Sequence, residues 1–438
     1  MVDVRAFRGI EYDISKVGDL SKVIAPPFDV ISPSLQRELH KLHPANVVRL
    51  ILPMEGAFYE GTSDRYQSAR SFLENWLREG ILIEREEPAI YLMSQTFDFK
   101  GEITRWGFIA TIKLEELDKG IVIPHEDTLS KPKEDRLKML QACEMNLSPI
   151  FTCYFDNDRK LREFFREIEN TAPYAQMKLD NLGLIRVWRV TAQSCLDAIK
   201  DIMKDMQLFI ADGHHRYESS LNYRNLMREL YPQIKDAPWE RVMVYLTDFE
   251  DPALLALPIH RAIRHLKGLT SREFLRSLSD VFELEPMQTI CEEKQKIWID
   301  DILKEMCKRG GTHIGMIIKG VSHPYLLKSR TQAVEEMMYD VPEPLRELDI
   351  IQLHRLALAD ILEIREKDLR DGEVIIYDHN PEAVVEKVMR DGWSAAFFLN
   401  RLEISQIKRV CLADLRMHQK STYFYPKLPT GVVFHRLR

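Results

Sequence analysis

The chain has 438 residues, of which 45% are hydrophobic and 29% charged, and its formal net charge at pH 7 is −7. This length and balance suit two or three globular domains with sizeable cores, whereas a nucleic-acid-binding protein would usually be basic. The sequence contains no apolar run long enough for a transmembrane helix, and its first residues do not form a secretory signal. We therefore expect a cytoplasmic protein that uses neither a membrane nor nucleic acid.

Residues 1–155 are expected to form an N-terminal α/β region. Ser32 followed by Pro33 is typical of a helix start, because serine caps the first turn and proline fits within it. Residues 63–79 carry apolar side chains at helical spacing, and residues 124–133 are polar and indicate a loop. The expected strands are Lys22–Ala25, Val47–Leu52, Ala89–Thr96, Thr104–Leu114 and Asn146–Tyr154, and the expected helices include Ser63–Glu79 and Glu134–Cys143.

The pattern changes twice in the rest of the chain. Residues 156–265 alternate helices and strands, and residues 266–438 form a C-terminal α/β region that is more helical from Ser271 onward. We expect an α+β (mixed α/β) fold with these three regions. The expected elements are Asp158–Asn170, Gly183–Val190, Ala192–Met206, Leu208–Ala211, His214–Leu230, Arg241–Asp248, Val374–Asp378, Pro381–Arg390, Ala395–Leu399 and Ile404–Leu415, followed by a loop at Met417–Lys427.

The clearest candidate site is the run Ala211–Tyr217, with the sequence A-D-G-H-H-R-Y. It joins a buried strand to a helix through an Asp-Gly turn, and the N-terminus of a helix attracts anions through its dipole and backbone N–H groups. Arg216 could add a forked pair of hydrogen bonds to phosphate oxygens. Asp212 could hold Mg²⁺ or take a proton. The run therefore predicts a phosphate site.

A purely structural interpretation of this run has Asp212 capping the helix and His214 and His215 lying on the surface. Two histidines and an arginine in one first turn suit that interpretation poorly, because positive charge opposes the dipole there. The functional interpretation is therefore favoured.

Three further segments could contribute to the site. His125, Glu126, Asp127 and Thr128, followed by Lys133 and Arg136, combine a base, carboxylates, a hydroxyl and cations in one loop and helix start. Lys420, Ser421 and Thr422 with Lys427 offer cations and hydroxyls near Tyr423 and Tyr425. Pro26-Pro27 stiffens a turn that presents Asp29 and Ser32. Each segment also has a purely structural interpretation. The first could be a solvated charged loop, the second an aromatic loop packed on the core, and the third a simple helix cap.

These motifs resemble two related protein families. The D-G-H-H-R-Y run after a strand is similar to the phosphate-binding helix start of the ParB/sulfiredoxin-like superfamily, which includes free-serine kinases. The resemblance extends to a ParB-related family of unknown function, domain of unknown function 1015, although His418 stands where that family is expected to have proline. The segments that carry the resemblance are Ile24–Ser32, Asn46–Leu50, Pro124–Thr128, Lys133–Leu137, Asn146–Phe151, Asp212–Tyr217, Leu257–Arg261 and Gln419–Lys427.

The resemblance implies a strand-turn-helix core with phosphate bound in residues 156–265, and a Mg²⁺-dependent phosphotransferase. Free L-serine is the leading acceptor, and ATP, ADP or pyrophosphate is the donor. One carboxylate among Asp29, Glu126 and Asp127 would accept the acceptor's proton. The implied catalytic residues are Asp212, His214, Asp29 and Glu126, with Asp212 also holding the metal; the phosphate-binding residues are Gly213, His214, His215, Arg216, Lys420, Ser421 and Thr422; and the substrate-binding residues are His125, Thr128, Arg136, Asn146, Ser148 and Lys427.

Two other functions are consistent with the same superfamily. A ParB-like nucleotide-binding regulator or DNA partner would lack small-molecule kinase activity, and the acidic net charge disfavours it. A sulfiredoxin-like repair enzyme would need a cysteine in the phosphate loop, where this chain has Gly213 and His214. The sequence leaves open whether the chain forms a homodimer.

Overall fold

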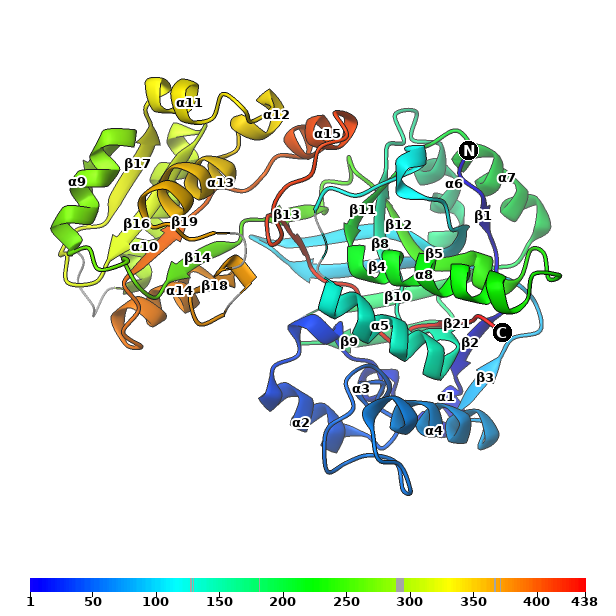
Figure 1. Ribbon diagram of the computed structural model, residues 1–438. Coiled ribbons are helices and arrows are strands. Elements are labelled where there is room, and N and C mark those ends of the chain that lie inside the picture. The colour runs from blue at the N-terminus through cyan, green and yellow to red at the C-terminus, as the bar shows by residue number, and fades with distance from the viewer. Residues whose placement is uncertain (127, 129, 181, 289–294, 366–367, 371) are drawn as a thin grey trace. The chain divides into compact units, whose positions relative to one another are not determined.

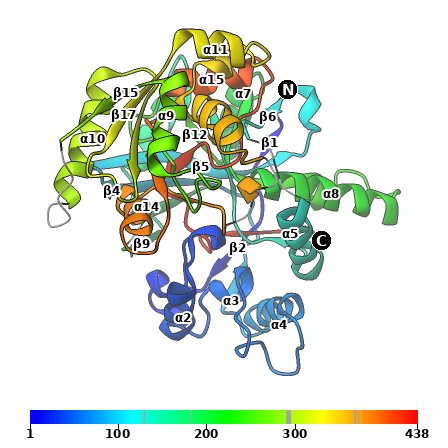
Figure 2. The same ribbon diagram turned by 60° about the vertical axis from the view of Figure 1, so that its left-hand side comes forward.

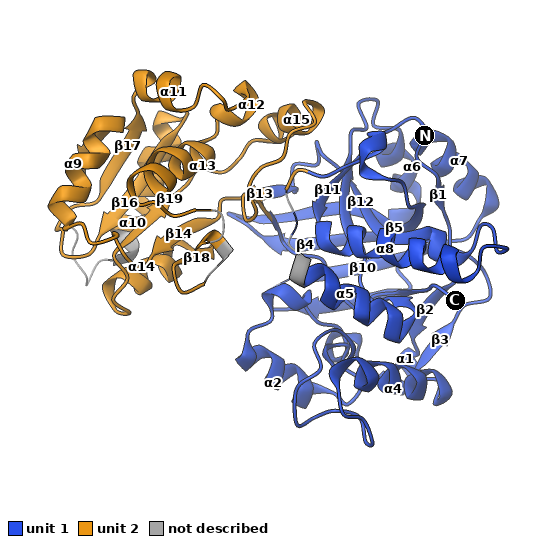
Figure 3. Cartoon of the chain, in the orientation of Figure 1, with its two compact units in different colours: residues 1–124, 128–255, 424–438 blue, residues 125–127, 256–423 orange. Residues whose placement is uncertain are grey.

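The computed structural model describes the chain except for residues 127, 129, 181, 289–294, 366–367 and 371. Its residues form two compact units (Figure 3). Unit 1 comprises Met1–Pro124, Thr128–Leu255 and Phe424–Arg438, and unit 2 comprises His125–Asp127 and Ala256–Tyr423. The short strands β13 (Leu255–Leu257) and β20 (Tyr423–Tyr425) lie where the chain passes from one unit to the other.

Unit 1 is built on a nine-stranded sheet, in the order β6-β11-β8-β12-β5-β4-β10-β9 with β1 paired to β5. A smaller sheet has the order β3-β2-β21-β7. The strands are β1 (Val4–Arg5), β2 (Gly9–Tyr12), β3 (Leu82–Glu84), β4 (Ile90–Asp98), β5 (Glu102–Lys113), β6 (Val122–Ile123), β7 (Met145–Asn146), β8 (Ile150–Tyr154), β9 (Ala175–Leu179), β10 (Gly183–Val190), β11 (Leu208–Asp212), β12 (Arg241–Asp248) and β21 (Phe434–Arg436).

The helices of unit 1 surround these sheets, and α5 and α8 run side by side (Figures 1 and 2). The α-helices are α1 (Ile14–Val17), α2 (Pro33–Leu42), α3 (Val48–Ile51), α4 (Arg65–Arg78), α5 (Ser130–Cys143), α6 (Lys160–Glu169), α7 (Gln193–Met203) and α8 (His214–Leu230), and the 3-10 turns include η2 (Phe28–Val30). Leu161 and Phe165 of α6, Ile199 of α7 and Tyr217 of α8 join one buried apolar core with the strands. This core fixes where α8 begins.

Unit 2 has its own six-stranded sheet, in the order β15-β17-β16-β19-β14-β18. Trp298, Ile302, Val385 and Phe398 belong to its separate buried core. The elements are β14 (His260–Ile263), α9 (Ser271–Val281), β15 (Phe282–Pro286), α10 (Gln295–Arg309), β16 (His313–Ile318), β17 (Tyr325–Ser329), α11 (Thr331–Met337), α12 (Glu343–Arg346), α13 (Asp349–Gln352), a π-helix η6 (Leu353–Ile361), β18 (Ile375–Asp378), α14 (Pro381–Met389), β19 (Ala395–Phe398) and α15 (Ile404–Leu412).

The mixed α+β class is confirmed, and so are most of the expected elements. The strands at Gly183–Val190 and Arg241–Asp248 and the helix at His214–Leu230 have the expected bounds. The helix cap at Ser32 is also confirmed, since its hydroxyl accepts a hydrogen bond from the N–H of Leu35 at 3.2 Å. Strong periodicity and local caps therefore predicted these elements well.

Several predicted strands are wrong. Val47–Leu52 contains the short helix α3, whose first N–H group, that of Val48, donates to the side chain of Asn46. Lys22–Ala25 is not a strand: Lys22 ends a 3-10 turn, and Ala25 forms only an isolated bridge to Thr430. A short apolar run does not distinguish a strand from a buried helical turn, so tertiary contacts decided both cases.

Two further expectations missed a change of structure within a segment. The segment Asn146–Tyr154 belongs to two strands in different sheets, β7 and β8. Residues Leu147–Pro149 between them are not part of a strand. The region after Ser271 also contains the strands β15, β16 and β17, which the helical pattern did not predict.

The sequence regions and the compact units divide the chain differently. Residues 1–155 fall in unit 1 apart from His125–Asp127, residues 156–265 belong to unit 1 only as far as Leu255, and residues 266–438 supply unit 2 as far as Tyr423. Among the described residues, we find no helix with the length and apolarity that crossing a membrane would require.

Candidate functional site

The run predicted to bind phosphate forms a strand, a tight turn and a helix. Strand β11 ends at Asp212, and α8 begins at His214. Gly213 between them has a left-handed backbone, with φ of 97°. A Cβ atom on Gly213 would lie 2.8 Å from Nη2 of Arg216. Glycine is therefore needed here both for the backbone conformation and for the close approach of the guanidinium.

Asp212 lies between two cations. Its Oδ2 accepts a hydrogen bond from Nη2 of Arg216 at 2.8 Å, and its Oδ1 accepts one from Nζ of Lys427. Burial by itself would raise the pKa of Asp212, but Lys427 and Arg216 outweigh burial and hold that pKa well below its usual range. The carboxyl group therefore stays charged at neutral pH, and the three side chains together carry a net positive charge.

Arg216 also ties the helix start to the segment before β8. Its Nη1 donates to Oγ of Ser148 at 3.1 Å and to the carbonyl of Pro149. His214 is buried and interacts electrostatically with Asp212, while His215 is half-buried. The fold thus brings together the predicted residues Asp212, Gly213, His214, Arg216, Ser148 and Lys427.

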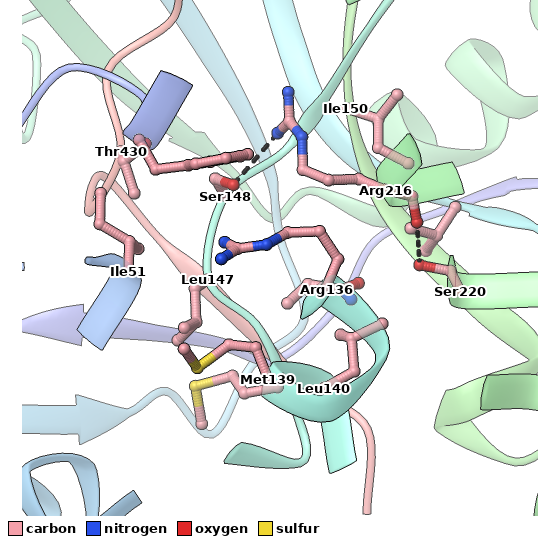
Figure 4. A pocket seen from close by; sticks show the side chains of 14 residues that line it. Ile51, Arg136, Met139, Leu140, Leu147, Ser148, Ile150, Arg216, Ser220 and Thr430 are labelled. Carbon is pink, nitrogen blue, oxygen red and sulfur yellow. Dashed lines mark hydrogen bonds between the residues drawn. The ribbon is translucent and has the colours of Figure 1, made fainter. Parts of the chain in front are cut away.

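A pocket adjoins this cluster in unit 1, and Figure 4 shows Ser148 between the guanidinium groups of Arg136 and Arg216. The cavity has a volume of about 50 Å³. Its polar lining residues are Arg136, Asn146, Ser148, Arg216, Ser220 and Thr430, and its apolar lining residues are Phe28, Ile51, Met139, Leu140, Met145, Leu147, Ile150 and Val242.

One predicted residue, Asn146, lines this pocket, and another, Asp29, follows a lining residue in the sequence. Asn146 is buried, and its side-chain oxygen accepts a hydrogen bond from the N–H of Met243 at 2.9 Å, which ties β7 to β12. Asp29 is exposed in the 3-10 turn η2, directly after Phe28, whose ring lines the pocket. Asn146 is therefore held by the fold, whereas the carboxyl group of Asp29 is accessible to solvent.

Other predicted residues connect the long loop to α8. Thr128 donates from its hydroxyl to Glu218 at 2.7 Å, and Lys133 donates to the other oxygen of Glu218, also at 2.7 Å. Thr128 therefore anchors the loop to α8, the helix whose start is predicted to bind phosphate. Asp127, the third candidate base, lies outside the described residues.

The remaining predicted residues form a second cluster, in unit 2. The Oε1 atom of Glu126 accepts hydrogen bonds from the N–H groups of Ser421 and Thr422, both at 3.0 Å, and from the Thr422 hydroxyl at 3.1 Å. His125 Nε2 lies 2.8 Å from the same hydroxyl. Lys420, just before them, has a left-handed backbone with φ of 61°. Consecutive N–H groups after such a residue suit an anion, and here the carboxylate of Glu126 occupies that position.

Arg261, which packs against this loop, was not among the predicted site residues. Arg261 is fully buried, and it donates from Nη2 to the carbonyl of Lys420 at 2.9 Å and from Nε to Nε2 of His354 at 3.3 Å. His418, where proline was expected, stacks on His354 with ring centroids 5.2 Å apart. The Leu257–Arg261 segment carried the family resemblance, which was the available signal.

A resident metal ion fits these residues poorly. The described part of the chain contains no group of three or more histidine, cysteine, aspartate or glutamate side chains placed to hold a metal. Both oxygens of Asp212 already accept hydrogen bonds from cationic side chains, which would repel a dication. Asp212 is therefore better suited to positioning Arg216 and Lys427 than to binding Mg²⁺ alone.

Comparison with protein families gives one match, and it covers most of the chain. The family described as "Protein of unknown function (DUF1015)" matches residues 4–351. No curated protein matches the sequence.

Several solved structures are distantly similar to the chain. A conserved hypothetical protein from Pyrococcus furiosus has a TM-score of 0.35 and 11% identity, covering 74% of this chain and 93% of its own. A variant of a free serine kinase in complex with AMP has a TM-score of 0.37 and 11% identity, covering 72% and 87%. SbnI from Staphylococcus aureus has a TM-score of 0.34 and 9% identity, covering 73% and 84%.

Proposed function

The chain belongs to the DUF1015 family of proteins of unknown function, and we propose that it is a phosphotransferase. The reaction moves a phosphoryl group from a nucleotide or pyrophosphate to the hydroxyl group of a small acceptor. The observation that carries the proposal is the convergence of Arg216, Lys427 and the start of α8 on Asp212, beside the pocket.

This arrangement suits the main demand of phosphoryl transfer, which is to position the reactants and neutralise the charge on the phosphoryl oxygens. Arg216 and Lys427 are held by one carboxylate, so their positions are set before a ligand enters. Their charges exceed that of Asp212, and the positive end of the α8 dipole adds to them. A donor phosphate is thus attracted to the start of α8, where the lack of a side chain on Gly213 lets the Arg216 guanidinium lie close to the turn.

The proton-transfer role falls to a different carboxyl group. Asp212 is a weak base because its pKa lies well below its usual range. Burial raises this pKa, but the charges of Lys427 and Arg216 lower it by more. Glu126 is engaged by the loop of unit 2. Asp29 is exposed and follows Phe28, whose ring lines the pocket, and it is the candidate that accepts the acceptor's proton as the acceptor's oxygen bonds to phosphorus and the donor's P–O bond breaks.

In this proposal, Mg²⁺ binds to the protein together with the phosphate donor. Mg²⁺ usually keeps several waters and is held largely by substrate phosphates, with one or two protein carboxylates. Such a complex needs no preformed cage of three side chains. The chelation of free Mg²⁺ by EDTA is therefore expected to abolish transfer without unfolding the protein.

The direct test is phosphorus NMR of the purified chain with Mg²⁺ and ATP, ADP or pyrophosphate. L-Serine is the first acceptor, because the sequence resemblance implies it, and other small hydroxyl compounds follow. A new phosphate-ester resonance is the expected result. Binding of a donor without any transfer would overturn the proposal and favour a nucleotide-binding regulator instead.

Variants then connect the activity to this site. Lys427→Met is expected to lower kcat/KM by about a hundredfold, since it removes one of the two charges aimed at the phosphate. Lys119→Met serves as the control, because Lys119 is an exposed lysine that pairs with Glu115 four residues earlier. Equal activity of both variants would show that the transfer occurs elsewhere.

A further inference from the structure

Arg136 is fixed in one position at the wall of the unit 1 pocket. Its guanidinium lies over the ring of Phe28, 4.1 Å from the centroid. Its Nε donates to Oδ2 of Asp135 at 2.9 Å, and its Nη2 donates to the same atom. The side chain is about nine-tenths buried, with 10% of its surface exposed. A stacked and paired guanidinium loses little freedom when it binds a ligand.

The remaining nitrogen of this guanidinium is available to a ligand. Within the part of the chain that the structure describes, Nη1 of Arg136 makes no hydrogen bond, and the guanidinium points into the pocket (Figure 4). Nη1 is not among the fully buried atoms that lack a partner, so it is accessible from the pocket and can donate to water or to a ligand. The lining near it is mostly apolar, as at Ile51, Met139 and Leu147, and the hydroxyl-bearing lining residues Ser148, Ser220 and Thr430 do not accept a hydrogen bond from Nη1. The position opposite Nη1 therefore suits an oxygen atom of a bound molecule.

The charges around the pocket indicate which charge a bound molecule should carry. Asp135 is shared by Arg136 and Arg65, and Asp212 is shared by Arg216 and Lys427, so both clusters carry a net positive charge. Among the described residues that line the pocket, none is acidic. An anionic group is therefore favoured here, whereas a ligand ammonium group would lie near two guanidinium groups and would meet no carboxylate among the described lining side chains, since Asp135 and Asp212 are already paired with arginines.

The size and the polarity of the pocket limit the ligand further. One water needs roughly 10–15 Å³, so the enclosed part of the pocket, at about 50 Å³, has the volume of a few waters and suits a small molecule. Its walls are mainly aliphatic, but Ser148, Ser220 and Thr430 can bond a hydroxyl group. The pocket thus suits a short molecule with a carboxylate at one end, a small aliphatic body and a hydroxyl group.

We infer that the pocket binds a small hydroxy carboxylate without an ammonium group, its carboxylate paired with Arg136. In the proposed transfer reaction, on which the catalytic part of this inference rests, such a compound is the acceptor in place of an amino acid. Arg136 is then the residue that selects the acceptor.

The test compares three probes that share a carbon skeleton, by isothermal titration calorimetry on the full chain. 3-Hydroxypropionate is L-serine without its ammonium group, and 1,3-propanediol also lacks the carboxylate. We expect 3-hydroxypropionate to bind about tenfold more tightly than L-serine or the diol. L-Serine binding as tightly as 3-hydroxypropionate would overturn the inference, and so would equal binding of all three.

Two variants connect the preference to Arg136. Arg136→Met is expected to remove the advantage of 3-hydroxypropionate over the diol, while Arg136→Lys retains part of it because the charge remains. Arg70→Met is the control, since Arg70 is exposed on α4 and pairs with Glu74. Circular dichroism checks the folding of each variant. An unchanged preference in folded Arg136→Met would contradict the inference.

The outcome separates this inference from the proposed function. If 3-hydroxypropionate is preferred in binding but no donor phosphorylates any acceptor, the transfer proposal fails and the pocket assignment stands. If phosphoryl transfer occurs with L-serine in preference to 3-hydroxypropionate, the transfer proposal stands and the pocket assignment fails.

Discussion

At the scale of single residues, the side chains at the start of α8 are held by a carboxylate that pairs with two cations. Arg216 and Lys427 both bind Asp212, and the side chain of Lys427 is only 8% exposed. Removing one partner of a buried ion pair leaves the other charge uncompensated, which usually costs more than the pair itself contributes. The same shared carboxylate that stabilises the fold here also keeps two cations in place for an anion.

Asp212→Asn is therefore expected to lower the free energy of unfolding by about 3 kcal/mol at pH 7, measured by urea denaturation. The pKa of Asp212 is lowered in the folded state, so its contribution is fully present above the unfolded pKa of 3.8. It is lost as the pH falls through the folded pKa. The difference between wild type and variant should therefore shrink below about pH 4.

Asp158→Asn is the matched control, because Asp158 pairs with Lys160 on an exposed surface. Its stability is expected to equal that of the wild type. If the stability difference between wild type and Asp212→Asn does not change with pH, the loss comes from altered packing and not from the lost negative charge of Asp212.

At the scale of elements, two short connections place the polar groups. The turn between β11 and α8 lets Arg216 fold back over Gly213 toward Asp212. In unit 2, Arg261 and Glu126 hold the loop after α15. Arg261 donates a hydrogen bond to the carbonyl of Lys420, and Glu126 accepts hydrogen bonds from the N–H groups of Ser421 and Thr422. Neither connection is stabilised by regular secondary structure, so single contacts determine the position of each.

Gly213→Ala tests the first connection. The new methyl group would adopt a strained backbone, at a cost of roughly 1 kcal/mol, and would also meet the Arg216 guanidinium. Gly120→Ala is the control, since Gly120 has φ of 63° and no atom within 4 Å of the added Cβ. Urea denaturation should show a larger loss for Gly213→Ala, and equal losses would argue against the contact with Arg216.

Arg261→Met tests the second connection. Burial lowers the pKa of Arg261 to about 10, and its guanidinium still holds the carbonyl of Lys420 at 2.9 Å. The variant is expected to speed amide hydrogen exchange at Ser421 and Thr422, because their loop loses its support. Arg355→Met, which removes an exposed arginine of the same unit, should leave that exchange unchanged. Unaltered exchange in Arg261→Met would mean that the other contacts of the loop, including those with Glu126 and His125, hold it without Arg261.

At the scale of the whole molecule, each unit has its own sheet and its own buried core. The core of unit 2 includes Trp298, Trp393, Val385 and Phe398, all between residues 256 and 423. A separate core of this kind is the usual mark of a segment that folds by itself.

We therefore expect residues 256–423, expressed alone, to unfold in one cooperative thermal transition. Near-ultraviolet circular dichroism should detect the fixed packing of Trp298 and Trp393, which are buried in that core. A broad transition without a near-ultraviolet signal would show that unit 2 needs the rest of the chain to fold. The full chain serves as the reference.

The sequence by itself determined the elements whose signals are local. The strand-turn-helix at Leu208–Leu230, the cap at Ser32 and the α+β class follow from periodicity, capping and turn chemistry, which act over a few neighbouring residues. The charged first turn of α8 also led to the prediction of a phosphate site there. The Val47–Leu52 segment was mistaken for a strand because its apolar pattern fits a buried helical turn equally well.

Only the tertiary structure decided which distant residues meet. Lys427 reaches Asp212 across 215 positions of sequence, and Arg216 reaches Ser148 across 68. The predicted site residues are divided between the two units, with Glu126 bound to Ser421 and Thr422 in unit 2 and Arg136 at the unit 1 pocket. Such pairings depend on strand order and on burial of the whole chain, and neither is encoded in a local pattern.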